Sequence, residues 1–253
     1  MPGFGEVETD SGEARSLGGG SEKAVLVFAM VFPTLAAWVY FVRFSGESWM
    51  LPLGGLSKLV QFGLPLAWVW LILRQPIRVR GASRDGLLFA GLLGLAISAS
   101  CLGLYYGYLK HHPAFRDAPE ALGEKLTGLG ADSLGGFILI AVFYSVVHSF
   151  LEEYYWRWFV YGRARRYIGR AWANPVSSLG FMAHHVIVID AFLPDDYFWT
   201  LAIPLSLCVS FGGVIWSVLY ERTGSLYGAW LSHALVDVAL MVCGYDMAFA
   251  GGA

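Results

Sequence analysis

The stretch GLLFAGLLGLAISASCLGLYYGYL, residues 86–109, is an apolar run of 24 residues that contains no charged side chain. A helix of about 20 apolar residues crosses the hydrocarbon core of a bilayer, so this run is long enough to span a membrane. Lipid offers no partners to backbone N–H and C=O groups, and the run lacks the apolar-polar alternation of a barrel strand. It therefore predicts a transmembrane helix.

The same pattern recurs along the chain, with an apolar run of roughly 17 to 24 residues followed each time by a polar or charged break. The predicted spans lie at roughly 24–42, 59–73, 86–109, 134–160, 175–189, 199–220 and 225–244. We therefore predict an all-α fold, a polytopic bundle of transmembrane helices with about seven spans, within a range of six to eight.

The composition excludes other classes of protein. Hydrophobic residues make up 57% of the chain and charged residues 14%, whereas about a quarter of a soluble domain is charged. A net charge of -2, spread over both signs, gives no basic face for nucleic acid, and the apolar composition makes the lipid bilayer the expected partner. The three cysteines lie in apolar runs without CxxC spacing, which predicts neither a zinc knuckle nor a disulfide framework.

The chain divides into a membrane domain and two tails. Residues 1–22 are rich in Gly, Ser and Glu and lack the pattern of a signal peptide, so we predict a disordered tail. The membrane-embedded domain is expected at 23–246, with a short C-terminal tail at 247–253. Residues 119–129 form either a short surface helix or a plain loop.

Basic residues alternate between the breaks. Loops 74–85 and 161–172 contain four arginines each, whereas loop 190–198 contains three acidic residues and 110–133 is mixed. Short basic loops face the cytoplasm, so this alternation predicts a cytoplasmic N-terminus and an outward C-terminus, as an odd number of spans requires.

Ionisable side chains within a span cost at least about 2.5 kcal/mol each, so they indicate function by default. In the fourth run, Glu153 and Arg157 are spaced to pair on one helix face, while Glu152 points about 100° away. Glu152 is thus left free to act as a general base. His148, one turn before Glu152, is expected to support it or merely to pack. The neighbouring aromatic residues allow another interpretation, in which these charges lie at the headgroup level.

Two further runs place histidines at the same depth. Counted from the cytoplasmic ends, Glu152 lies about 12 Å into the membrane, His185 about 15 Å and His233 about 12 Å. His233 and Asp237 share a helix face at i, i+4. Separate helices therefore bring polar groups to one level, which a buried catalytic site requires and scattered packing residues do not explain.

In this order on successive helices, the sequences EEYYWR (152–157), FMAHH (181–185) and HALVD (233–237) resemble the motifs of a known family. They are similar to those of the CPBP family, which includes type II CAAX prenyl endopeptidases and bacterial Abi-like proteins. The resemblance covers roughly 134–245, and 219–237 also resembles the family's approach to its third motif. It implies an intramembrane endopeptidase.

The resemblance also implies roles for individual residues. Glu152, assisted by His185, would activate a water for attack on a peptide carbonyl, and His233 with Asp237 would stabilise the oxyanion. The spacing from Phe181 selects His185 rather than His184 as the motif histidine. The expected supporting residues are Glu153, Arg157, His148 and His184.

The chain departs from the family pattern at two positions. Trp158 stands where the family often has Gly, and Asp237 stands where Asn is common. An anionic Asp237 would repel an oxyanion, so it must be protonated or must orient His233 instead. Two glutamates and two histidines could also form a zinc site. No HExxH or similar compact spacing occurs, and the resemblance favours a metal-free site, so we predict no cofactor.

The expected substrate is a protein or peptide anchored in the membrane, cleaved near its anchored end by a site that opens toward the cytoplasmic leaflet. It could be a lipidated C-terminal tail, a sorting tail, a leader peptide or a peptide toxin. The alternative is a non-catalytic membrane protein, such as a bacteriocin self-immunity factor or a proton-coupled carrier. No internal repeat of the kind that carriers often show is evident.

Overall fold

The computed structural model describes residues 14–47, 49–76 and 80–250, and every regular element in these ranges is a helix. The α-helices are α1 (Ala14–Trp38), α2 (Met50–Ala67), α3 (Arg84–Gly107), α4 (Ala118–Gly128), α5 (Leu134–Val142), α6 (Ser149–Glu153), α7 (Gly162–Asp190), α8 (Ile203–Thr223) and α9 (Leu226–Tyr245). Short π-helical segments extend several of them without a break in the chain direction. The predicted all-α fold is confirmed.

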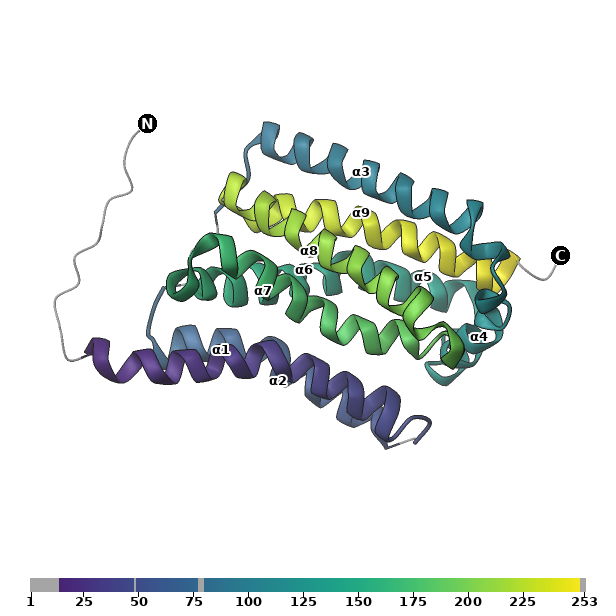
Figure 1. Ribbon diagram of the computed structural model, residues 1–253, viewed down its shortest axis with the longest axis horizontal. Coiled ribbons are helices and arrows are strands. Elements are labelled where there is room, and N and C mark those ends of the chain that lie inside the picture. The colour runs from purple at the N-terminus through teal and green to yellow at the C-terminus, as the bar shows by residue number, and fades with distance from the viewer. Residues whose placement is uncertain (1–13, 48, 77–79, 251–253) are drawn as a thin grey trace.

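Among the described residues, six continuous helical segments are long and apolar enough to cross a membrane. The longest, Leu134–Asp190, has 57 residues. It contains one non-helical residue, Gly169, with φ 71° and ψ 168°. After this residue the chain runs back alongside the preceding helix, so the segment makes two passes (Figure 1). Glycine adopts a positive φ without a steric penalty, which explains the sharp turn here. The bundle thus has seven passes, which agrees with the predicted fold.

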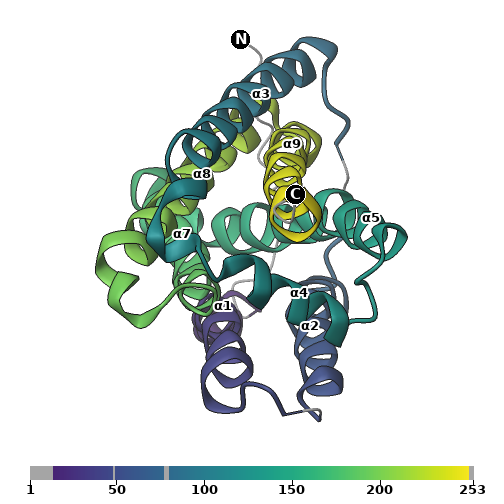
Figure 2. The same ribbon diagram turned by 90° about the vertical axis from the view of Figure 1, so that its right-hand side faces the viewer.

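The helices form a bundle whose outer surface is apolar. Leu59 and Leu139 are each 73% exposed, and Trp199 is 77% exposed. In water such a surface would drive aggregation, whereas lipid solvates it. The chain is therefore an integral, multi-pass membrane protein. Viewed along the helices, α3 and α9 lie at one side, α1 and α2 at the opposite side, and α7 lies between α8 and α1 (Figure 2).

The basic turns gather at one end of the bundle (Figure 1). Arg163, in the turn between the fourth and fifth passes, lies 2.6 Å from Glu22 near the start of α1. Arg165 in the same turn pairs with Glu221 near the end of α8. These two ion pairs join the start of α1, the turn after the fourth pass and the end of α8. The predicted alternation of basic and acidic loops requires these three parts to lie on the same side of the membrane. The assignment of this end to the cytoplasm stays a prediction.

Close contact between α3 and α9 positions one wall of the site. A Cβ atom added to Gly94 would lie 2.9 Å from the backbone Cα of Ser232. Ser98 donates a hydrogen bond to the carbonyl of Leu235 at 2.9 Å. Small residues let helix backbones approach closely in a membrane, where packing rather than the hydrophobic effect drives association. Ser232, which Gly94 contacts, directly precedes His233. The contact therefore fixes the position of His233 along the bundle axis.

Several predicted boundaries differ from the structure. The second helix begins at Met50 instead of residue 59, and this places Lys58 within a span. Helix α1 begins at Ala14, so the N-terminal part predicted as a tail is helical from that residue, while residues 1–13 lie outside the described ranges. The helix option for 119–129 is the one observed, as α4. In the predicted C-terminal tail, a π-helical segment continues to Ala250, and 251–253 are not described.

Candidate active site

Glu152 and Glu153 lie on α6, a single α-helical turn between two π-helical segments. The flanking segments are Phe143–His148 and Tyr154–Tyr161. Glu152 is 4% exposed and Glu153 is fully buried. Two adjacent carboxylates at this depth must obtain their partners from the protein.

Three imidazoles surround the carboxylate of Glu152. Nε2 of His148 lies 3.3 Å from Oε1, and Nε2 of His184 lies 3.7 Å from the same oxygen. Nε2 of His233 lies 3.7 Å from Oε2. His148 belongs to the same long helix, His184 to α7 and His233 to α9. Residues far apart in the sequence thus meet at one carboxylate, and His148, expected only as a supporting residue, makes the shortest of these contacts.

His185 has a defined tautomer. Its Nδ1 lies 2.8 Å from the carbonyl oxygen of Phe181. A carbonyl can only accept a hydrogen bond, so Nδ1 carries the proton and Nε2 presents a lone pair. The Phe181 ring also packs edge-on against the His185 ring, with centroids 4.5 Å apart. Phe181 therefore orients His185 through both its backbone and its side chain, which gives a physical reason for their spacing.

His184 is held differently. Its ring is parallel to that of Trp156 at a centroid distance of 5.8 Å, and its centroid lies 4.2 Å from that of His185. Nδ1 of His184 is buried and has no hydrogen-bond partner among the described residues. Both histidines therefore lie at the site, and they differ in which ring nitrogen the protein fixes.

Glu153 connects two of the three motifs. One of its oxygens lies 2.9 Å from Nδ1 of His233, and the other lies 3.3 Å from Nε of Arg157. The pairing of Glu153 with Arg157 was expected, whereas the contact with His233 was not. The Arg157 guanidinium lies over the rings of Phe181 at 4.8 Å and Trp216 at 5.3 Å, a cation–π arrangement. This buried network links the fourth, fifth, sixth and seventh passes.

His233 is fixed on its other sides as well. Its ring stacks on that of Trp216, with centroids 3.8 Å apart and an interplanar angle of 16°. Nε2 lies 3.6 Å from Oδ1 of Asp237, one turn later on α9, as the spacing predicted. Since Glu153 occupies Nδ1, the Nε2 atom of His233 is directed between Glu152 and Asp237. The sequence offered no signal that distinguished Trp216 from other apolar residues of its helix.

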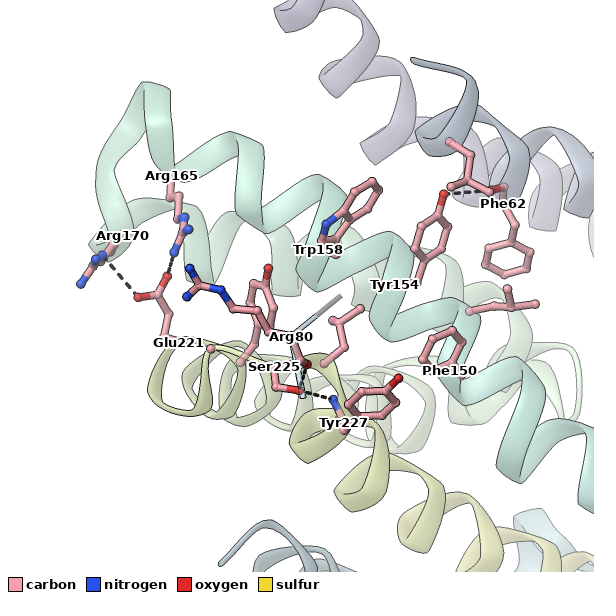
Figure 3. A pocket seen from close by; sticks show the side chains of 15 residues that line it. Phe62, Arg80, Phe150, Tyr154, Trp158, Arg165, Arg170, Glu221, Ser225 and Tyr227 are labelled. Carbon is pink, nitrogen blue, oxygen red and sulfur yellow. Dashed lines mark hydrogen bonds and ion pairs between the residues drawn. The ribbon is translucent and has the colours of Figure 1, made fainter. Parts of the chain in front are cut away.

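A cavity of about 760 Å³ lies along the same helix but on another face (Figure 3). Glu152 does not line it, whereas the adjacent Leu151 does. The walls at one end are apolar and aromatic: Phe62, Leu66, Phe150, Leu151, Tyr154 and Trp158. The other end is charged: Arg80, Arg165, Arg170 and Glu221. The cavity thus offers an apolar end beside the helix that carries Glu152 and a basic end at the turns.

Lys58 is a further charged residue near the site that sequence reasoning missed. It is the one charged residue in the segment Met50–Ile72. Its Nζ lies 5.6 Å from the centroid of the Phe62 ring, and that ring lies 6.0 Å from the ring of His148. A single charge within an apolar run was the available signal. It was missed because the predicted span began at residue 59, directly after Lys58, whereas the helix begins at Met50.

The side chains of Glu152, His184 and His185 lie close enough together to bind a metal ion. One ligand atom from each of Glu152, His184 and His185 lies within 4.8 Å of the others, and no other group of this kind occurs in the described part of the chain. Two imidazoles and one carboxylate, with an open position for water, match the ligands of catalytic zinc sites. The geometry is thus compatible with zinc as well as with a metal-free site.

Comparison with known proteins gives one match. The family described as Rce1-like, type II CAAX prenyl endopeptidase, matches residues 134–239. No curated protein and no solved structure matches the chain. The matched region contains all three sequence motifs and every glutamate and histidine of the cluster around Glu152. Over these residues, the chain is similar to the Rce1-like family of type II CAAX prenyl endopeptidases.

Proposed function

We propose that the protein is a glutamate-dependent intramembrane endopeptidase that hydrolyses a peptide bond near the membrane-anchored end of its substrate. The family match over residues 134–239 supports a CAAX endopeptidase in a broad sense. The observation that carries the finer proposal is the position of Glu152, whose carboxylate lies within 3.7 Å of imidazoles from two other passes. A buried carboxylate surrounded by imidazoles suits proton transfer at a water molecule.

In the proposed reaction, Glu152 takes a proton from a water molecule while Nε2 of His185 accepts the second hydrogen bond of that water. The water oxygen forms a bond to the carbonyl carbon of the scissile peptide, and the carbonyl oxygen becomes an oxyanion. His233, protonated on both nitrogens, donates from Nε2 to the oxyanion. The C–N bond then breaks, and the proton held by Glu152 passes to the leaving amine.

The surrounding residues hold this geometry. Glu153 accepts a hydrogen bond from Nδ1 of His233 and pairs with Arg157. Asp237, which lies 3.6 Å from Nε2 of His233, restricts the ring from the other side. Such orientation matters because displacements of about 1 Å at a reacting group can reduce a rate by about 100-fold. We assign Glu153, Arg157 and Asp237 as positioning residues.

The substrate is anchored in the membrane, and its lipid group binds in the cavity beside the catalytic helix. The apolar and aromatic walls of this cavity suit a lipid chain. Its basic end lies among the arginine-rich turns, which we assign to the cytoplasm. Access from that side agrees with a substrate that carries a lipidated C-terminal tail.

The test uses the full chain in detergent micelles and a fluorogenic peptide with a farnesylated cysteine near its C-terminus. Glu152→Gln should reduce kcat by about 100- to 10,000-fold while the thermal unfolding temperature stays close to that of the parent. Glu124→Gln is the matched control, since Glu124 is exposed on α4 at the opposite end of the bundle. Full activity of Glu152→Gln, or no cleavage by the parent protein, would refute the proposal.

The alternative is a non-catalytic membrane protein, such as an immunity factor or a proton-coupled carrier. It makes the opposite prediction for a cellular assay. If a protective phenotype persists in Glu152→Gln at unchanged expression, hydrolysis does not produce that phenotype.

A further inference from the structure

Lys58 is a charge within the membrane that the proposed reaction does not use. It lies on α2, about 12 Å along the helix axis from Met50 and about 21 Å from Ile72. A lysine at such a depth costs about 2.5 to 3.5 kcal/mol on insertion, so its presence calls for a partner or a function.

The side chain of Lys58 is directed toward the site. Its ammonium lies on the same face as Phe62, one turn further along α2, whose ring contacts the rings of His148 and Tyr155. The ammonium therefore lies near the part of α2 that packs on the helix carrying Glu152.

The ammonium has unused hydrogen-bonding capacity. It donates to Oε1 of Gln61 at 3.2 Å, and the Gln61 side chain is held in place because the residue is only 2% exposed. An ammonium carries three donors. In the parts of the chain that the structure describes, no carboxylate lies within 4.0 Å of Lys58. The side chain of Lys58 is exposed, so a ligand can reach the remaining donors.

An anion that pairs with Lys58 must reach this depth. Lipid headgroups stay at the interface, whereas Lys58 lies about 12 Å along the helix from the nearer end of the span. A peptide in the active site brings one anion of its own, the C-terminal carboxylate. An extended peptide advances about 3.3 to 3.6 Å per residue, so a few residues bridge the distance from the scissile bond to a neighbouring helix.

We propose that Lys58 binds the C-terminal carboxylate of the substrate, a few residues beyond the scissile bond, and thereby selects peptides with a free C-terminus. The inference rests on the proposed function, because it gives binding sites to two parts of one bound substrate, the lipid group and the C-terminal carboxylate. The lipid group occupies the cavity walled by Tyr154 and Trp158, and the carboxylate pairs with Lys58 on the other side of Phe62.

The experiment compares two farnesylated peptides that differ only at the C-terminus, one a free acid and the other a carboxamide. The parent protein should show a KM about 10- to 100-fold lower for the acid, as a charge-assisted hydrogen bond contributes. Lys58→Met should raise the KM for the acid peptide to the value for the amide peptide. The KM for the amide peptide should stay unchanged. Lys58→Arg should restore part of the preference. Lys125→Met, on the exposed surface of α4, is the matched control.

A second measurement does not depend on turnover. In the inactive Glu152→Gln background, binding of the two peptides is followed by fluorescence anisotropy, with and without Lys58→Met. Loss of acid binding alone supports the inference. Equal weakening of both peptides by Lys58→Met, or equal cleavage of both peptides by the parent protein, would overturn it. Failure to cleave either peptide would instead refute the endopeptidase proposal together with this one.

Discussion

Nδ1 of His233 lies 2.9 Å from Oε1 of Glu153, so a glutamate of the first motif holds the histidine of the third. The two residues are 80 positions apart in the sequence. Because the bond fixes Nδ1 of His233, it directs Nε2 toward Glu152 and Asp237. The adjacent glutamates thus have different surroundings, one among imidazoles and one between Arg157 and His233.

Glu153→Gln should lower kcat by about 100-fold with little change in KM, because the amide no longer holds His233 in the orientation that serves the oxyanion. Steady-state kinetics on the farnesylated peptide would measure the two constants separately. Glu153→Gln keeps the size of the side chain but leaves Arg157 as a buried cation without its anion, so the unfolding temperature should also fall, and kcat is measured below both unfolding transitions. An increase in KM at constant kcat would argue against the positioning role.

Arg157→Met should destabilise the protein by about 3–5 kcal/mol, because Glu153 would be left as a buried charge without its cation. The guanidinium is 1% exposed and lies between two aromatic rings, so water cannot replace it. Thermal unfolding in detergent measures the effect. The double variant Arg157→Met with Glu153→Gln should recover part of the loss, and an absence of recovery would assign the loss to packing alone.

His185→Ala should reduce kcat by about 100-fold or more, whereas His184→Ala should have a smaller effect on kcat. The reason is that Phe181 fixes the tautomer of His185 and leaves its Nε2 free to accept a hydrogen bond from water. The pair is an internal control, since the two residues are adjacent and share their surroundings. A larger loss for His184→Ala would reverse the assignment of the two residues.

Treatment with a zinc chelator should leave activity unchanged, and metal analysis of the purified protein should give far less than one zinc per chain. This outcome follows from the use of Glu152 as a base rather than as a ligand. The cluster of Glu152, His184 and His185 makes the experiment decisive, because these donors would suit zinc. Loss of activity with the chelator and its return with added zinc would establish a metal mechanism.

Gly94→Ala should destabilise the bundle by about 1–3 kcal/mol, since a Cβ would lie 2.9 Å from the backbone of Ser232 and would push α3 away from α9. Gly103→Ala on the same helix is the matched control, because a Cβ there meets nothing within 4 Å. Both unfolding temperatures are measured in the same detergent. Equal stability of the two variants would contradict the assigned close contact.

Helix positions and motif residues followed from the sequence because membrane insertion constrains each segment locally. The run at 86–109 had to be a helix, and the spacing of Glu153 and Arg157 placed both side chains on one face. The beginning of α2 was missed because Gly and Pro within residues 50–55 weaken the apolar signal, although lipid tolerates them in helices. That error concealed Lys58.

The sequence by itself determined that the chain crosses the membrane as helices, and it predicted similar depths for Glu152, His185 and His233. These properties depend on the composition and length of each run, which are local. Only the tertiary structure decided which partners those residues have: His148 against Glu152, and His233 against Glu153. The reason is that helix rotation and contact depend on packing between distant segments, such as Gly94 against Ser232, which no single run encodes.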